Sequence, residues 1–195
     1  MTALPHRPTI SVEEYLQIDR NSIEKRYEYI DGHITMLAGG TLKHTAISFN
    51  IARTLYDALR GSSCHVYTSD ARVRLSESRY VYPDITVSCD QRDQGEVDII
   101  QSPRLIVEVL SPSTEDYDRG RKFTFYRGCP TIQEYILVST DHKSVEVCRR
   151  ERNDLWVLQM FGPDDTVELV NLGIHFSVSA VYEGIDFPDN NSEPV

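Results

Sequence analysis

A short apolar run, Leu105-Ile106-Val107-Glu108-Val109-Leu110, carries one carboxylate at Glu108. A nearly continuous apolar run of this length is typical of a strand that is covered on both faces of a sheet. Because side chains alternate along a strand, Glu108 shares a face with Ile106 and Leu110 and must be buried with them. Burying an ionised carboxylate costs roughly several kcal/mol unless an ion pair, a raised pKa or a cation compensates it. The run therefore predicts a buried strand whose acid needs a partner.

The elements expected around this strand favour an α+β fold, a mixed β-sheet flanked by helices. Ser11-Val12-Glu13-Glu14 is a capping box that predicts a first helix, and Asp31-Gly32 predicts a two-residue hairpin turn. The helices are expected at residues 12–19, 41–60, 115–127 and 178–183. The strands are expected at 27–30, 33–37, 64–68, 71–75, 81–88, 104–110, 134–139, 144–149, 156–161 and 167–170. We expect one domain over residues 1–188 and a disordered tail over 189–195.

A second acid, Asp84, follows Pro83 within the expected strand 81–88. Proline lacks an amide hydrogen and interrupts a strand ladder, so a bulge here would turn Asp84 away from the regular pleat. If the two strands are neighbours, Asp84 and Glu108 converge on one divalent cation. Oxygen ligands with open water positions are the pattern of Mg²⁺ or Mn²⁺, which can assist phosphoryl transfer.

The helix expected after the Glu108 strand adds a cationic group, Lys122. Asp118, Lys122 and Tyr126 lie four residues apart and share one helix face. Lys122 is then able to reach a phosphate or an attacking water, with Asp118 holding it in place. Simpler interpretations stay open: Asp84 as an ordinary strand-end residue, Asp118–Lys122 as a surface pair worth only about 0.3 kcal/mol, and Glu108 paired with Arg72 or Arg74.

At these residues the sequence resembles the Uma2 family (DUF820) of the PD-(D/E)XK nuclease superfamily, whose fold is restriction-endonuclease-like. Pro83-Asp84 resembles the PD element, and Glu108-Val109-Leu110-Ser111-Pro112-Ser113 resembles the family's E-V-L-S-P-S element. Asp118, Lys122 and Tyr126 match its downstream helix. The superfamily lysine two residues after the glutamate is replaced by Leu110, so the resemblance implies that Lys122 substitutes for it.

The resemblance also covers the N-terminal part of the chain. Tyr27-Glu28-Tyr29-Ile30-Asp31-Gly32 resembles the family's hairpin, and His44 matches the histidine that opens its long helix. The resemblance implies accessory roles for Glu28 and His44 beside the metal ligands, and it implies a homodimer. A surface cross-strand position for Glu28 and a plain helix-start position for His44 remain equally open.

The charge balance argues against strong non-specific binding to nucleic acid or to an anionic membrane. Asp and Glu total 30 against 20 Lys and Arg, a formal net charge of −10. Arginines near the Lys122 helix (Arg119, Arg121, Arg127), together with Arg72 and Arg74, are the candidates for a local positive groove. The four widely spaced cysteines predict reduced thiols rather than a zinc cluster or a disulfide framework. With no apolar signal or membrane-length segment, we expect a cytoplasmic protein.

Together these patterns predict a Mg²⁺-dependent (or Mn²⁺-dependent) endonuclease acting on DNA. Asp84, Glu108 and the Val109 carbonyl would bind the cation, Lys122 would act on the water and phosphate, and Glu28, His44 and Asp118 would support them. Two other hypotheses remain: a non-catalytic binding or assembly module of the same fold, and a metal-dependent hydrolase of a smaller phosphoester.

Overall fold

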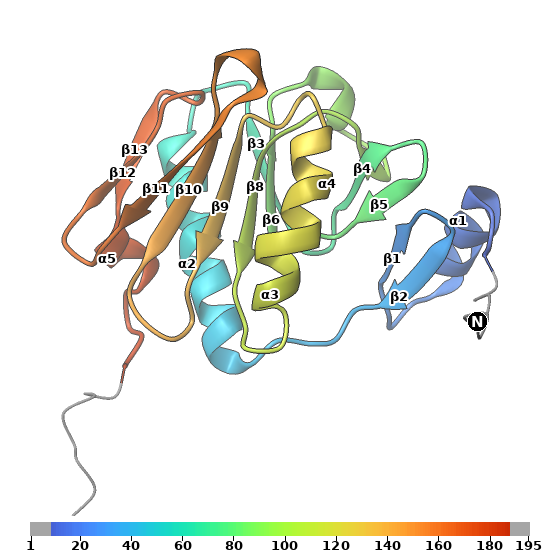
Figure 1. Cartoon of the computed structure of the whole chain (residues 1–195), viewed down its shortest axis with the longest axis horizontal. Helices are drawn as coiled ribbons and strands as arrows, with labels where there is room; N and C mark the ends of the chain where they lie inside the picture. Colours follow the sequence, from blue (N-terminus) through green and yellow to red (C-terminus); the bar gives the residue numbers. More distant parts are fainter. Residues whose placement is uncertain (1–8, 188–195) are drawn as a thin grey trace, which may run out of the picture.

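The computed structural model of the chain describes residues 9–187, which form mixed sheets flanked by helices (Figure 1). The expected α+β class is correct. The expected tail at residues 189–195 lies outside the described residues. No helix among the described residues has the length and apolar character needed to cross a membrane.

The larger sheet has six strands in the order β11-β10-β9-β8-β6-β3. The strand that carries Glu108, β8, lies inside this sheet; it pairs in parallel with β9 and antiparallel with β6. All of its residues except Arg104 are buried, as the apolar run predicts. The strands are β3 (His65–Thr68), β6 (Ile85–Ser88), β8 (Pro103–Val109), β9 (Glu134–Val138), β10 (Val145–Arg150) and β11 (Trp156–Phe161).

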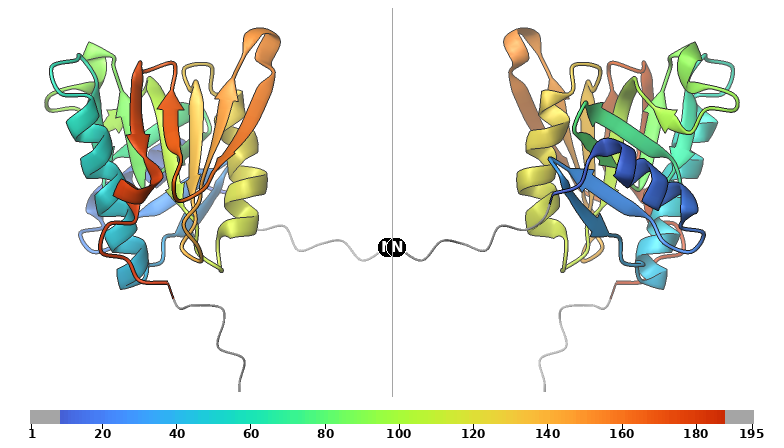
Figure 2. Two further views of the ribbon diagram at one scale, coloured as in Figure 1. Left: turned by 90° about the vertical axis from the view of Figure 1, so that its left-hand side faces the viewer. Right: turned by 90° about the vertical axis from the view of Figure 1, so that its right-hand side faces the viewer.

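Helices cover both faces of this sheet (Figure 2). On one face lies α2 (Leu42–Ala58), whose stripe of Ile47, Ile51, Leu55 and Leu59 is fully or almost fully buried against the sheet. A short hairpin and the final helix extend that layer: β12 (Thr166–Leu169), β13 (Ile174–Ser177) and α5 (Val178–Val181). On the other face lie α3 (Glu115–Tyr117) and α4 (Phe123–Gly128), and α4 contributes Phe125 and Tyr126 to a second core.

The smaller sheet, in the order β2-β1-β5-β4-β7, lies beside the larger one together with α1 (Figure 1). The expected capping box forms at Ser11 and Glu14, and Asp31 and Gly32 take the positive φ angles of the expected hairpin turn. The elements are α1 (Val12–Asn21), β1 (Tyr27–Ile30), β2 (His33–Met36), β4 (Arg72–Ser76), β5 (Arg79–Val81) and β7 (Ile99–Ile100).

The strand expected at 81–88 is two strands in different sheets. β5 ends at Val81 in the small sheet, and β6 begins at Ile85 in the large one. Pro83 lacks the amide that would continue the ladder, so the chain crosses between the sheets at Pro83-Asp84. This crossing is what places Asp84 beside β8.

The helix expected at 115–127 is also interrupted. A π-helical turn, η2 (Asp118–Lys122), separates α3 from α4. Such a turn accommodates an extra residue within a helix and occurs frequently at functional sites. The sequence patterns also missed β13, β7 and two 3-10 turns, η1 (Gln91–Asp93) and η3 (Arg152–Asp154).

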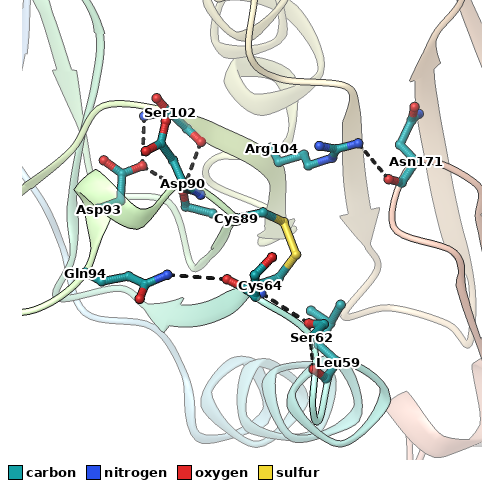
Figure 3. Close-up of a disulfide and its surroundings, with 12 residues drawn as sticks. Leu59, Ser62, Cys64, Cys89, Asp90, Asp93, Gln94, Ser102, Arg104 and Asn171 are labelled. Carbon is teal, nitrogen blue, oxygen red and sulfur yellow. Dashed lines mark hydrogen bonds between the residues drawn. A yellow bond between two sulfur atoms is a disulfide. The ribbon is translucent and has the colours of Figure 1, made fainter.

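The expectation of reduced cysteines is wrong for two of them. Cys64 and Cys89 form a disulfide across the start of β3 and the end of β6 (Figure 3). These strands pair antiparallel with His65 opposite Ser88, so the residues just beyond that pair meet, although they lie 25 residues apart in sequence. Cys129 and Cys148 are free and buried, as expected for structural thiols.

Candidate active site

Asp84 lies at the crossing between β5 and β6, where it makes two links to β8. Its Oδ2 accepts a hydrogen bond from the Val109 amide at 2.7 Å, and its own amide lies 3.4 Å from Glu108 Oε2. The side chain remains about one-fifth exposed, at 20%. The Asp84 side chain therefore contacts the backbone of β8, and the Glu108 side chain contacts the backbone at Asp84. The structure thus brings the two predicted carboxylates side by side.

Glu108 and Lys122 form a buried ion pair inside this site. Lys122 Nζ lies 2.8 Å from Glu108 Oε1, and both side chains are less than a tenth exposed. The Tyr126 hydroxyl donates to the same Oε1 at 2.5 Å. Glu108 does not pair with Arg72 or Arg74, because Arg72 bonds Asp19 and Arg74 bonds Glu77. The buried acid thus finds its compensation from the helix that follows its strand.

Two further carboxylates surround the same ammonium group. Lys122 Nζ lies 3.4 Å from Glu28 Oε1 and 3.8 Å from Asp118 Oδ1. Glu28 is buried on β1, where its Oε1 also accepts a hydrogen bond from the Tyr82 amide at 3.3 Å. The surface interpretation of Glu28 is therefore wrong, and so is that of the Asp118–Lys122 pair. The small sheet, the large sheet and the helix each supply an acid to one lysine.

The excess of acids over the single lysine sets the electrostatics of the site. Burial raises the pKa of Glu108 to about 8, although Lys122 opposes this effect. Burial also raises the pKa of Asp118, again against Lys122. Burial by itself would lower the pKa of Lys122, but the three carboxylates outweigh it and hold the pKa above its ordinary value. Lys122 therefore stays charged, and the cluster can accept further positive charge.

His44, near the start of α2, contacts Asp84, and both side chains are partly exposed. Its Nε2 lies 3.3 Å from Asp84 Oδ2. The hydrogen bond to Asp84 raises the pKa of His44, and the Val109 carbonyl adds to that effect against the opposing effect of burial. Gly40 allows this position, because a Cβ there would lie 2.7 Å from His44 Nδ1. His44 thus joins the predicted site, and Gly40 determines how closely the ring packs.

The oxygen donors fit a hard divalent cation such as Mg²⁺ or Mn²⁺ better than a softer metal such as Zn²⁺. Among residues 9–187, no group of three or more His, Cys, Asp or Glu side chains is arranged to hold a metal ion. Mg²⁺ is commonly bound by only one or two carboxylates, with water filling its other positions. Asp84, Glu108 and the Val109 carbonyl supply oxygen donors of that kind, in a cluster with excess negative charge.

The arginines predicted to line a local positive groove are mostly paired with other groups of the chain. Arg119 bonds both Glu115 and Glu146, and Arg72 is buried against Asp19. Arg121 and Arg127 instead lie over the rings of Phe125 and Phe123. Most of these predicted basic residues are therefore occupied by interactions within the chain.

Sequence reasoning missed part of how the site is supported. The sequence predicts that Tyr126 and Tyr135 are packing residues with a hydroxyl partner, and it missed only which partners these are: the Tyr126 hydroxyl bonds Glu108 and the Tyr135 hydroxyl bonds the Asp118 carbonyl at 3.2 Å. The four-residue spacing from Lys122 to Tyr126 was the available signal for the first of these bonds. Gly40 had no signal beyond its place four residues before His44.

Comparison with known proteins gives a consistent result. Residues 12–179 match the model of the Uma2 family, described as "Putative restriction endonuclease". Two proteins of Synechocystis sp., both named as uncharacterized, are similar along most of their length: slr1290 is 37% identical over 92% of this chain and 95% of its own, and sll1609 is 32% identical over 82% and 92%. A crystal structure described as a "putative nuclease belonging to DUF820" from Anabaena variabilis shares the fold with a TM-score of 0.73, at 20% identity over 89% of this chain and 98% of its own.

Proposed function

Because the chain belongs to the Uma2 family of restriction-endonuclease-like proteins, we propose that it is a metal-dependent endonuclease that hydrolyses phosphodiester bonds of DNA. The observation that carries the proposal is the cluster of Asp84, Glu108 and Lys122, in which a buried ammonium group lies 2.8 Å from a carboxylate adjacent to a second, partly exposed carboxylate. Perturbed ionisable groups gathered in this way are characteristic of catalytic sites.

In this proposal Asp84, Glu108 and the Val109 carbonyl hold Mg²⁺ or Mn²⁺. When bound, such an ion supplies a nucleophilic hydroxide at neutral pH and stabilises the charge that develops on the phosphate. The Val109 amide and His44 keep the Asp84 carboxylate in position. The Tyr126 hydroxyl fixes the Glu108 carboxylate.

Lys122 orients the attacking water and provides positive charge beside the scissile phosphate. Glu28 and Asp118 also contact the ammonium group, and their negative charge keeps it protonated. His44 serves as a proton shuttle or phosphate contact, since its imidazole contacts Asp84 and is itself partly exposed.

The test is cleavage of supercoiled and linear DNA with Mg²⁺ or Mn²⁺, comparing the wild-type protein with Asp84→Asn. The substituted amide keeps the side-chain shape but lacks the charge needed for the cation. We expect cleavage by the wild type and a loss of at least about 10²-fold in Asp84→Asn, with Asp57→Asn on the exposed end of α2 as the matched control. Equal cleavage by Asp84→Asn and the wild type would reject the assigned site.

A second candidate function is a non-catalytic binding or assembly module of the same fold. The occupied arginines favour it, because they leave less free positive charge to attract DNA. Calorimetric titration with Mg²⁺ and Mn²⁺ separates the two functions. Binding that is lost in Asp84→Asn supports the nuclease, whereas a folded protein that binds neither ion supports the module.

We further propose that one domain over residues 1–188 acts as a cytoplasmic homodimer through the edge strand β11. This strand is the last in the large sheet, and its Leu158 and Met160, on the same face, are 54% and 69% exposed. An unpaired edge with apolar side chains can pair with a second copy of itself about a two-fold axis. Light scattering should give a dimer for the wild type and a monomer for Met160→Lys; a monomeric wild type contradicts the proposal.

A further inference from the structure

A polar cleft lies away from the candidate catalytic cluster, between the end of α1, the small sheet and the η1–β7 loop. Its volume is about 550 Å³, within the range of sites that bind small molecules. Tyr82 separates the two sites: its amide donates to Glu28 in the cluster, and its hydroxyl donates to Asp19 in the cleft. The proposed nuclease chemistry makes no use of this cleft.

The inner part of the cleft holds a buried ion pair with one unused donor. Arg72 Nη1 donates to Asp19 Oδ2 at 2.7 Å, and Arg72 and Asp19 are 4% and 6% exposed. Asp19 also accepts from the Tyr82 hydroxyl and from the Tyr27 amide at 3.2 Å, so its oxygens are occupied. Arg72 Nε is buried and has no hydrogen-bond partner. An unpaired buried donor is costly, and because Arg72 lines the cleft, a small turn of its side chain would offer this donor to a ligand with a hydrogen-bond acceptor.

The acceptor that suits this position is an uncharged one. Asp19 already balances the charge of Arg72, so a buried anion beside them would carry uncompensated charge. A carbonyl oxygen or a ring nitrogen satisfies the Nε–H group without that cost. Asp93 cannot compete for it, because its carboxylate already accepts from the Ser88 hydroxyl and from two backbone amides at 2.8 and 2.9 Å.

Part of the cleft lining is aromatic and aliphatic. Tyr67 and Tyr82 line it, and the Tyr67 hydroxyl is held by the Asp93 carbonyl. Two large apolar side chains at its mouth are unusually exposed, Ile23 at 92% and Val97 at 50%. Apolar surfaces of this kind suit the flat faces of a heteroaromatic ring.

The mouth also carries two loosely paired arginines. Arg26 lies 3.6 Å from Asp70 and Arg20 lies 3.8 Å from Asp98, distances longer than a hydrogen bond. Such exposed pairs contribute little energy, so either guanidinium group can turn toward a ligand. The cleft therefore combines Arg72, whose Nε donor is unused, with aromatic and aliphatic side chains in a polar lining and with arginines at its entrance.

We propose that this cleft binds a nucleotide, with the base inside against Arg72 and the phosphate at Arg20 and Arg26. The base supplies the neutral acceptor and the flat ring, and the phosphate supplies the negative charge for the entrance. The nucleotide comes either from solution or from a nucleic-acid strand in which one base is turned out of the stack.

The test is an NMR titration of the whole protein in a chelating buffer, so that no cation bound at Asp84 recruits the phosphate. The probes are deoxynucleosides, their 5′-monophosphates, inorganic phosphate and a short single-stranded oligonucleotide. We expect saturable shifts at the cleft residues with the monophosphates, weaker ones with the nucleosides and none with inorganic phosphate. Saturation by the oligonucleotide at the same residues identifies the strand as the source, and its absence identifies the free nucleotide.

Variants separate the two parts of the proposed ligand. Arg72→Lys keeps the charge beside Asp19 but lacks Nε, and it should weaken nucleoside and nucleotide binding about 10-fold or more. Arg26→Ala should weaken nucleotide binding alone. Val97→Glu, at an exposed position, should weaken nucleotide binding even if Arg72→Lys fails to fold. Arg60→Ala, on an exposed arginine outside the cleft, should change neither.

Three results would overturn the proposal. The first is the absence of saturable shifts at the cleft with up to about 10 mM monophosphate, a concentration well above the Kd of a weak specific site. The second is binding of inorganic phosphate as tight as that of the nucleotides. The third is nucleotide binding that neither Arg72→Lys nor Val97→Glu alters. None of these results depends on DNA cleavage. The proposed nucleotide site can therefore be rejected without rejecting the proposed nuclease, and the reverse also holds.

Discussion

Replacing Lys122 with methionine removes an ammonium group that contacts three carboxylates. The lysine side chain is 8% exposed, and its Nζ lies 2.8, 3.4 and 3.8 Å from Glu108, Glu28 and Asp118. Breaking a buried ion pair by removing one partner costs roughly 3–5 kcal/mol, because the remaining charge is left uncompensated. Since a domain is stable by about 5–15 kcal/mol, Lys122→Met should fold but be severely destabilised.

The loss should depend on pH in a definite direction. Without the ammonium group, the folded-state pKa values of Glu108 and Asp118, which burial already raises, rise further above their unfolded values. A group of this kind contributes stability that is present below its unfolded pKa, near 4, and is lost as pH rises toward the folded pKa. The slope is up to about 1.4 kcal/mol per pH unit for each proton. The destabilisation by Lys122→Met should therefore be smaller at pH 5 than at pH 8.

Urea unfolding followed by circular dichroism at pH 5, 6.5 and 8 measures this difference. Lys25→Met, at an exposed position, removes the same charge without touching a buried acid and should change the free energy of unfolding by less than about 0.5 kcal/mol. If Lys122→Met costs less than about 1 kcal/mol at every pH, the carboxylates do not depend on Lys122 and the reasoning about the buried cluster fails.

The remaining predictions concern other parts of the site and fold. Because the folded-state pKa of Glu108 is raised to about 8, the affinity for Mn²⁺ should rise with pH up to that value, and binding should release a proton. Calorimetry in two buffers of different ionisation enthalpy detects the proton. An affinity that stays constant from pH 6 to 8 refutes this prediction. Tyr126→Phe should lower the free energy of unfolding by about 1.5–3 kcal/mol, measured by urea unfolding, and no change would show that the bond to Glu108 contributes nothing. Reducing Cys64–Cys89, whose cysteines are 25 residues apart in sequence, should lower the free energy of unfolding by about 3.5 kcal/mol in the same assay, and Cys64→Ser should remove the effect of reductant.

The sequence was sufficient to find the candidate catalytic cluster because its signals are local. Glu108 interrupts an apolar run, and such an acid must find a partner wherever the strand lies in the fold. Lys122 lies on the next helix, close enough in sequence to be that partner. The same logic explains why α2 and the hairpin at Asp31-Gly32 were predictable: helical periodicity and positive-φ turns depend on a few neighbouring residues.

The predictions from sequence were wrong where tertiary packing determines the local structure. Residues 81–88 alternate well enough to be one strand, and only the position of the second sheet shows that Pro83-Asp84 is a crossing. The π turn at Asp118–Lys122 was invisible because the four-residue spacing suits an ordinary helix as well. Cys64 and Cys89 meet only because β3 and β6 pair, and no local pattern gives the register of that pair. The arginine pairings with Glu146 and Asp19 have the same long-range origin.

The lysine and the acids belong to separate parts of the fold: Glu108 on β8, Glu28 on the small sheet and Lys122 in the turn before α4. A sheet formed without the docked helix would hold carboxylates but no Lys122 ammonium group among them. In the proposed nuclease, DNA cleavage therefore requires that folding is complete. A partly folded chain lacks Lys122 beside the carboxylates and is inactive toward the DNA of the cell that makes it. An activity measurement would then report the docking of α3 and α4 onto the sheet, not the presence of the sheet alone.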